Sequence, residues 1–184
     1  MRHLLIYLFL LNTGVLFSQD KVNPFITRNG TVEFLSETPV ETIYSKNNYV
    51  SCAFDPNNGD LVFQINIISF KFKKALMQEH FHEKYMETDR YPRSTFVGRI
   101  ENWNPDMLNS NKDYNVKAKG VILIHGIEKE IEADGRLIVD NDKVSMLSNF
   151  NVRLDDFNIK VPKLVAKNIA ETINIDLNIN LFQQ

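Results

Sequence analysis

The sequence contains a single cysteine, Cys52, among 184 residues. One thiol excludes an intrachain disulfide framework and a metal site built from several thiolates. Cys52 alternates with Val50 and Phe54, so we expect it in the core or lumen of a β-structure, where a buried thiol is inert. Stability must therefore come from apolar packing and not from crosslinks.

An excess of charge is also missing, because 21 basic residues stand against 23 acidic ones and the net charge is -2. An even balance excludes the basic surface that binds nucleic acid. The sequence has no glycine-rich phosphate loop, no dinucleotide fingerprint, no G-x-S-x-G nucleophile turn and no zinc-ligand spacing. We therefore predict a protein that is not an enzyme and that uses no metal and no cofactor.

The N-terminus has the layout of a secretory signal peptide. Residues 1–3 form a short basic segment, residues 4–17 are mostly apolar, and polar residues resume at Ser18. A membrane anchor is the alternative, but this stretch is shorter than the roughly 20 residues a span needs and is interrupted by Asn12-Thr13-Gly14. We predict a signal peptide at 1–18 and one mature domain at 19–184. The mature protein would be periplasmic or secreted, with no stable membrane insertion.

Alternation of apolar and polar residues dominates the mature chain, as is typical of β-strands with one buried face. The clearest run is Ile173 to Leu181, where every second residue is Ile or Leu and the residues between are Asn or Asp. Similar runs lie near 116–124, 127–139 and 144–152, and earlier candidates lie at 31–35, 40–45, 49–54, 60–69 and 94–102. The pattern predicts an all-β antiparallel meander of about eight or nine strands. It fits a closed barrel or a sandwich equally well.

Residues 73–86 do not alternate in this way. They are rich in helix formers, so we predict one α-helix there. Met77, Phe81 and Tyr85 recur every four residues, with Leu76 and His80 beside them, and form one apolar stripe. Such a helix could cap one end of a barrel or lie along its side. Residues 155–167 contain Pro162, and we expect a loop there with a short helical turn.

The sequence gives only weak evidence for a metal site or a catalytic site. His80 and His82 would point about 200° apart on a helix, and Glu79 with His82 or Glu83 is at most half of a metal site. His125 precedes Gly126 between two apolar runs, where a turn histidine is the simpler interpretation than a catalytic one. The adjacent Asp155 and Asp156 are interpreted as helix caps or solvated groups.

Five motifs in order resemble the YceI-like family, exported proteins with a lipocalin-like barrel associated with lipid and polyisoprenoid binding. They are F-x-I-x-I-x-S-F-x-F at 63–72, L-M-x-E-H-F at 76–81, YPRSTF with Gly98 at 91–98, GVILIHG at 120–126 and DFNI at 156–159. The resemblance spans residues 31–181. In the segment HFHEKYME the chain departs from the family's usual His-Leu and paired aromatic residues.

The resemblance implies a lipocalin-like barrel whose lumen holds a lipid or isoprenoid-like molecule, and it leaves a homodimer open. As the alternative, some of the 13 Phe could fill that lumen and leave a packed barrel with a structural or partner-binding role. If the lumen is open, the alternation predicts this lining: Phe54, Phe63, Ile65, Ile67, Leu76, Met77, Phe81, Phe96, Ile100, Ile122, Ile124, Met146, Phe150 and Phe157.

Overall fold

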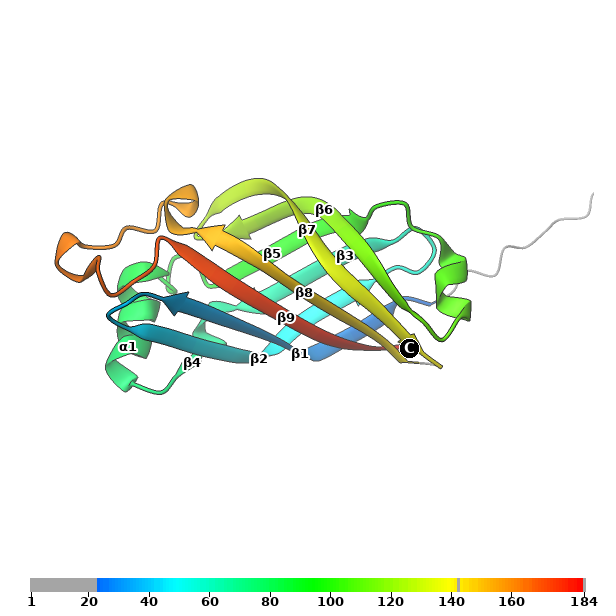
Figure 1. The fold of residues 1–184 in the computed structure, drawn as a ribbon, viewed down its shortest axis with the longest axis horizontal. Helices are drawn as coiled ribbons and strands as arrows, with labels where there is room; N and C mark the ends of the chain where they lie inside the picture. The colour runs from blue at the N-terminus through cyan, green and yellow to red at the C-terminus, as the bar shows by residue number, and fades with distance from the viewer. Residues whose placement is uncertain (1–22, 142, 184) are drawn as a thin grey trace, which may run out of the picture.

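The fold is an elongated β-barrel, seen in a computed structural model that describes residues 23–141 and 143–183 (Figure 1). The predicted signal peptide lies outside these residues. The described strands are β1 (Phe25–Glu37), β2 (Thr42–Phe54), β3 (Asp60–Asn66), β4 (Lys71–Phe72), β5 (Arg93–Ile100), β6 (Asp113–Ile124), β7 (Ile127–Asp140), β8 (Lys143–Arg153) and β9 (Thr172–Gln183).

Closure of the sheet decides between the two architectures that alternation left open. The order is β1-β9-β8-β7-β6-β5-β3-β2, with every neighbouring pair antiparallel, and β1 pairs with β2 as well as with β9. Eight strands therefore form a closed barrel, as expected from the family resemblance. The two-residue β4 adds to β2 through Ser45 and Lys46.

One correction concerns residues 40–54, which were expected to form two strands and form the single strand β2. Ser45 and Asn47 face inward, and after Asn48 and Tyr49 the inward positions become Val50, Cys52 and Phe54. The register with β1 shifts at this place, on both sides of Gly30. A β-bulge reverses the alternation without ending the strand, which is why the pattern resembles two strands.

The helical segment is also shorter and less regular than expected. The α-helix α1 covers only Ala75–His80 and continues as a π-helical turn, η2, over Phe81–Tyr85. The amide of Met86 donates to the carbonyl of Phe81 at 2.9 Å, which is the wider i→i+5 bond of a π-turn. None of the described helices is both long and apolar enough to span a membrane.

Short 3-10 turns complete the connections: η1 (Ile67–Ser69), η3 (Pro105–Asn109), η4 (Leu154–Phe157) and η5 (Lys163–Val165). The expected strand at 60–69 therefore ends at Asn66, where η1 begins. The turns η4 and η5 fall within the loop expected before the last strand.

The two ends of the barrel differ in how tightly they are packed. At the end that carries the C-terminus of β9, Leu137, Ile179 and Leu181 have no exposed surface. On the same strands but toward the other end, Ile131, Ile175 and Leu177 face inward and are only half-buried. We call these the packed end and the hollow end.

The hollow end is bordered by four connections that together form its rim: residues 38–41, 67–92, 125–126 and 154–171. Figure 1 shows α1 and the connection between β8 and β9 at this same end of the molecule, opposite the C-terminus.

Candidate functional site

The hollow end contains an apolar cavity of about 370 Å³ that extends from the middle of the barrel to the rim. Its wall includes side chains from β1, β3, β5, β6, β7, β8, β9 and the helical segment. Val116 and Ala118 on β6 point inward yet are only half-buried, because they border this space. The volume is within the 300–1,000 Å³ typical of ligand pockets.

Eleven of the fourteen residues nominated from the sequence lie on the cavity wall. Except for Ile67 in the turn η1, they share inward positions on strands or on the apolar stripe of the helical segment. The eleven are Phe63, Ile65, Ile67, Met77, Phe81, Phe96, Ile100, Ile122, Ile124, Met146 and Phe150.

The other three nominated residues lie away from the cavity. Phe54 points inward but belongs to the packed end, where its ring meets Trp103 edge-on at 5.0 Å and Phe25 at 6.1 Å. Leu76 is 61% exposed, because it precedes Met77 by one residue and so points about 100° away around α1. Phe157 is buried in η4 beside Lys129, since the 3-10 turn interrupts the alternation of β8.

Four phenylalanine rings form a cluster where the helical segment meets the barrel wall. Phe34 and Phe81 are stacked at 5.4 Å, and Phe70 and Phe72 each lie 5.6 Å from Phe34. Phe72 also lies 5.0 Å from Phe81. Of the four, the sequence nominated only Phe81. The alternation Val32, Phe34, Ser36 would have indicated Phe34.

Two polar side chains on the cavity wall already have partners. The hydroxyl of Ser148 donates to the carbonyl of Asp134 at 2.7 Å, and the hydroxyl of Ser36 accepts from the amide of Ala170 at 2.9 Å. Satisfied hydroxyls demand no partner from a ligand. The lining is mostly apolar, although it also includes Ser94, Thr95 and Arg136, and Glu41, His80 and Asn168 lie nearer the rim.

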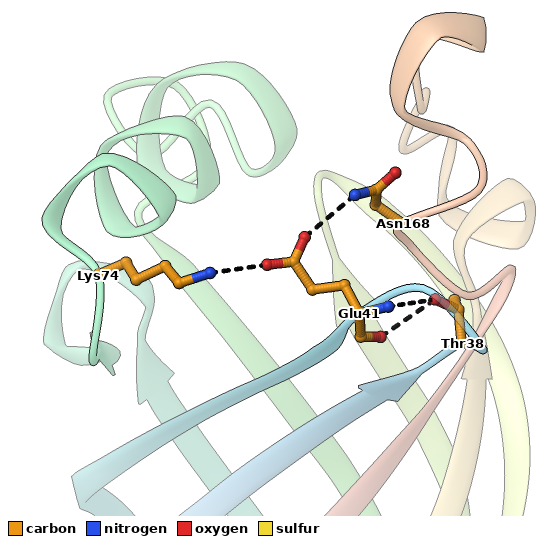
Figure 2. Close-up of polar contacts among 4 residues, drawn as sticks. All are labelled: Thr38, Glu41, Lys74 and Asn168. Carbon is orange, nitrogen blue, oxygen red and sulfur yellow. Dashed lines mark hydrogen bonds and ion pairs between the residues drawn. The ribbon is translucent and has the colours of Figure 1, made fainter.

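Glu41 joins three rim connections, as Figure 2 shows. One carboxylate oxygen accepts from the Lys74 ammonium at 2.9 Å and the other from the Asn168 amide at 3.2 Å. Its backbone bonds the hydroxyl of Thr38, which fixes the turn between β1 and β2. The Lys74 bond, followed by the Asn168 bond, lowers the pKa of Glu41 below its ordinary value. We call these contacts the Glu41 latch.

His125 holds another part of the rim together. Its Nδ1 lies 3.0 Å from the carbonyl oxygen of Phe157 and its Nε2 lies 2.8 Å from the carboxylate of Glu87. The Tyr91 ring packs edge-on against it at 4.6 Å. Both His125 and Gly126 have positive φ, as a two-residue hairpin turn requires. The turn interpretation is therefore correct, and both ring nitrogens have structural partners.

Groups suited to other chemistry do not assemble in the described part of the chain. Among these residues, no three of the His, Cys, Asp or Glu type come together to hold a metal ion. Burial raises the pKa of Cys52 to about 12, which leaves the thiol unreactive. Asp156 forms an ion pair with Lys129 at 2.9 Å.

The barrel, its inserted helix and its cavity can be compared with known proteins. The sequence model of the YceI-like domain family matches residues 25–181 of this chain. The chain belongs to the YceI-like family. This agrees with the resemblance of the five motifs. No curated protein sequence matches this YceI-like chain significantly.

Solved structures with the same fold include a polyisoprenoid-binding domain from Saccharophagus degradans implicated in plant cell wall breakdown. It has a TM-score of 0.76 and 12% identity over 89% of this chain and 100% of its own. BcnA of Burkholderia cenocepacia has a TM-score of 0.68 and 15% identity over 83% and 95% of the two chains. The Campylobacter jejuni YceI protein has a TM-score of 0.60 and 18% identity over 76% and 84%.

Proposed function

We propose that this YceI-like protein is exported and binds a lipid or isoprenoid-like molecule, with its apolar chain inside the hollow end of the barrel. The observation that carries the proposal is the apolar cavity of about 370 Å³ reaching the rim. The name of the Saccharophagus degradans neighbour, a polyisoprenoid-binding domain, supports the same class of ligand. The N-terminal pattern of residues 1–18 supports export.

The alternative of a barrel packed throughout has less support. Packing is complete at one end, where Phe54 and Leu137 have no exposed surface. At the hollow end Phe150 and Ile131 border empty space and are only half-buried. Empty apolar cavities attract apolar molecules more readily than water. That the protein is not an enzyme stays a prediction.

The wall favours a ligand with a polar end near the rim and an apolar chain further inside. Each buried methylene contributes about 0.8 kcal/mol, so a chain of 20 carbons would gain about 16 kcal/mol before the costs of ordering and association. An extended polyisoprenoid much longer than the barrel does not fit inside it. A shorter chain suits this cavity better.

The proposal is tested by the contents of the purified protein. The processed protein is isolated from exporting cells without detergent, extracted with organic solvent and examined by mass spectrometry. The delipidated protein is then titrated with the apolar dye N-phenyl-1-naphthylamine. We expect a co-purifying apolar compound in stoichiometric amount, and its competition with the dye. Absence of both a bound compound and dye binding would refute the proposal.

A further inference from the structure

Several aliphatic side chains at the rim of the cavity point into solvent. Val40 is 62% exposed, Ile68 57%, Leu76 61% and Leu164 95%. They come from four separate parts of the rim: the turn between β1 and β2, the turn η1, the helix α1 and the turn η5. Single exposed apolar residues are ordinary on protein surfaces, and these four matter because all of them lie on connections around one opening.

Lysines surround these aliphatic residues. Residues 67–78 contain Lys71, Lys73 and Lys74 and no Asp or Glu, and residues 157–170 contain Lys160, Lys163 and Lys167 and again no Asp or Glu. All six are exposed. Three acidic side chains nearby already have partners: Glu41 with Lys74, Glu87 with His125 and Asp156 with Lys129. Glu79, Glu83 and Asp89 lie later in the helical connection, and Asp155 and Glu171 lie at the two ends of the connection between β8 and β9.

The two basic segments border the same opening. Lys74 and Asn168 belong to different segments and bind the same Glu41 carboxylate (Figure 2). Val165 and Ile169, on either side of Asn168, line the cavity. In Figure 1 the connection between β8 and β9 projects beyond the ends of the strands at this end. Leu164 lies within this connection, in η5.

We propose that this rim docks on the surface of an anionic lipid bilayer, with Leu76 and Leu164 in the headgroup region and the lysines against lipid phosphates. Partial insertion of apolar side chains and attraction of lysines to anionic lipids reinforce each other at a membrane surface. The mouth of the cavity then faces the membrane. The role of this orientation in loading a ligand rests on the proposed function; the docking itself rests on the rim alone.

A fluid bilayer fits this rim better than a folded protein partner does. The aliphatic residues are on separate connections with exposed lysines among them, so they do not form one continuous apolar surface. A protein interface needs a closely packed apolar centre of matched shape. Lipid headgroups rearrange around each side chain and need no such match.

Sedimentation with vesicles tests the docking. The processed protein, its N-terminus established by mass spectrometry, is mixed with vesicles of phosphatidylcholine alone or with 30% phosphatidylglycerol. We expect binding to the anionic vesicles that weakens with added salt, and little binding to the neutral ones. Leu164→Ser should weaken the binding about tenfold, and Lys160→Glu with Lys163→Glu at least about 30-fold.

Matched changes at the packed end serve as controls. Phe182 is 59% exposed there, and Lys112 and Lys143 are exposed at the starts of β6 and β8. Phe182→Ser and the pair Lys112→Glu with Lys143→Glu make the same kinds of change away from the rim. We expect both to bind vesicles within twofold of the parent. Thermal melting checks that every variant is folded.

Three results would overturn the docking proposal. The parent could fail to bind anionic vesicles, the rim variants could bind as well as the parent, or the protein could bind native membranes but not protein-free vesicles. The last result would indicate a protein partner. Dye uptake in solution is measured in parallel. Loss of dye uptake with intact vesicle binding refutes the proposed function alone, and the reverse refutes the docking alone.

Discussion

Phe96 shows how single residues shape the cavity wall. Its ring lies over Gly98 and Gly120, which face each other on β5 and β6. A Cβ at Gly98 would lie 2.7 Å from Cζ of Phe96 and 2.4 Å from the carbonyl oxygen of Lys119. A Cβ at Gly120 would lie 2.8 Å from the same ring atom. The two glycines therefore leave room for the ring along the wall, and the space beyond it stays open.

Phe96→Trp should reduce ligand uptake and leave the fold intact. The larger indole can extend into the cavity, where it takes space equivalent to about two methylenes, so dye affinity should fall about tenfold or more. Titration with N-phenyl-1-naphthylamine measures the affinity, and urea unfolding should show a loss of less than about 1 kcal/mol. Val97→Trp is the control, because Val97 is 56% exposed on the outer face. Unfolding of Phe96→Trp would instead place Phe96 in a tightly packed core.

The sequence pattern predicted whether a residue points into the barrel better than it predicted the residue's position along the barrel axis. Phe54 and Phe63 both occupy inward positions, but Phe54 has no exposed surface at the packed end and Phe63 lies on the cavity wall. Alternation has a period of two along a strand and carries no record of position along the barrel axis. Leu76 and Phe157 lie away from the cavity for another reason: they belong to the helical elements α1 and η4, where alternation does not apply.

At the scale of elements, the helical segment and the rim connections border the mouth of the cavity. Met77, Phe81 and Tyr85 face the cavity from α1 and η2, as their spacing predicted. The sequence did not indicate the Glu41 latch, because Glu41, Lys74 and Asn168 are far apart in the chain. Contacts of this kind depend on how three loops meet in space.

Glu41→Gln should loosen the mouth and speed ligand release at neutral pH, because Lys74 loses its charged partner. In the parent the pKa of Glu41 is lowered, so the latch is complete at pH values above the ordinary glutamate pKa and is lost as the pH falls through the lowered one. Dye release by stopped-flow fluorescence from pH 7 to pH 3 should therefore accelerate in the parent only once the pH has fallen past the ordinary glutamate pKa to the lowered pKa of Glu41. The variant should release quickly throughout.

Glu33→Gln is the matched control for the latch. Glu33 forms an ion pair with Lys46 at 2.9 Å on the outer wall, and its pKa is also lowered, first by that hydrogen bond. We expect this variant to release dye at the parental rate at neutral pH. Equal acceleration in both variants would mean that the change reflects general destabilisation and not the rim.

At the scale of the whole molecule, the barrel is fully packed at one end and contains a cavity at the other. Closure could not be predicted from alternation, since a sandwich has the same periodicity. It depends on β1 pairing with both β2 and β9, which joins strands from opposite ends of the chain. The bulge in β2 and the paired glycines of β5 and β6 lie within this closed sheet.

The two ends should respond differently to the same truncation. Phe54→Ala removes a fully buried ring and should destabilise the protein by about 3–5 kcal/mol. Phe150→Ala removes a half-buried ring that already borders the cavity, so the loss should be less than about 2 kcal/mol. Urea unfolding of both variants measures the difference. Equal losses would contradict the division into a packed and a hollow end.

If the hollow end binds an apolar chain, as proposed, its affinity for such chains should depend on their length. Linear prenyl alcohols of increasing length are titrated against the dye-loaded protein, and their displacement constants are compared. We predict that affinity rises with each added isoprene unit and reaches a plateau when the cavity is full. Phe96→Trp should shift that plateau to a shorter chain. Affinity that is absent, or that does not change with chain length, would refute the proposed binding of an apolar chain in the hollow end.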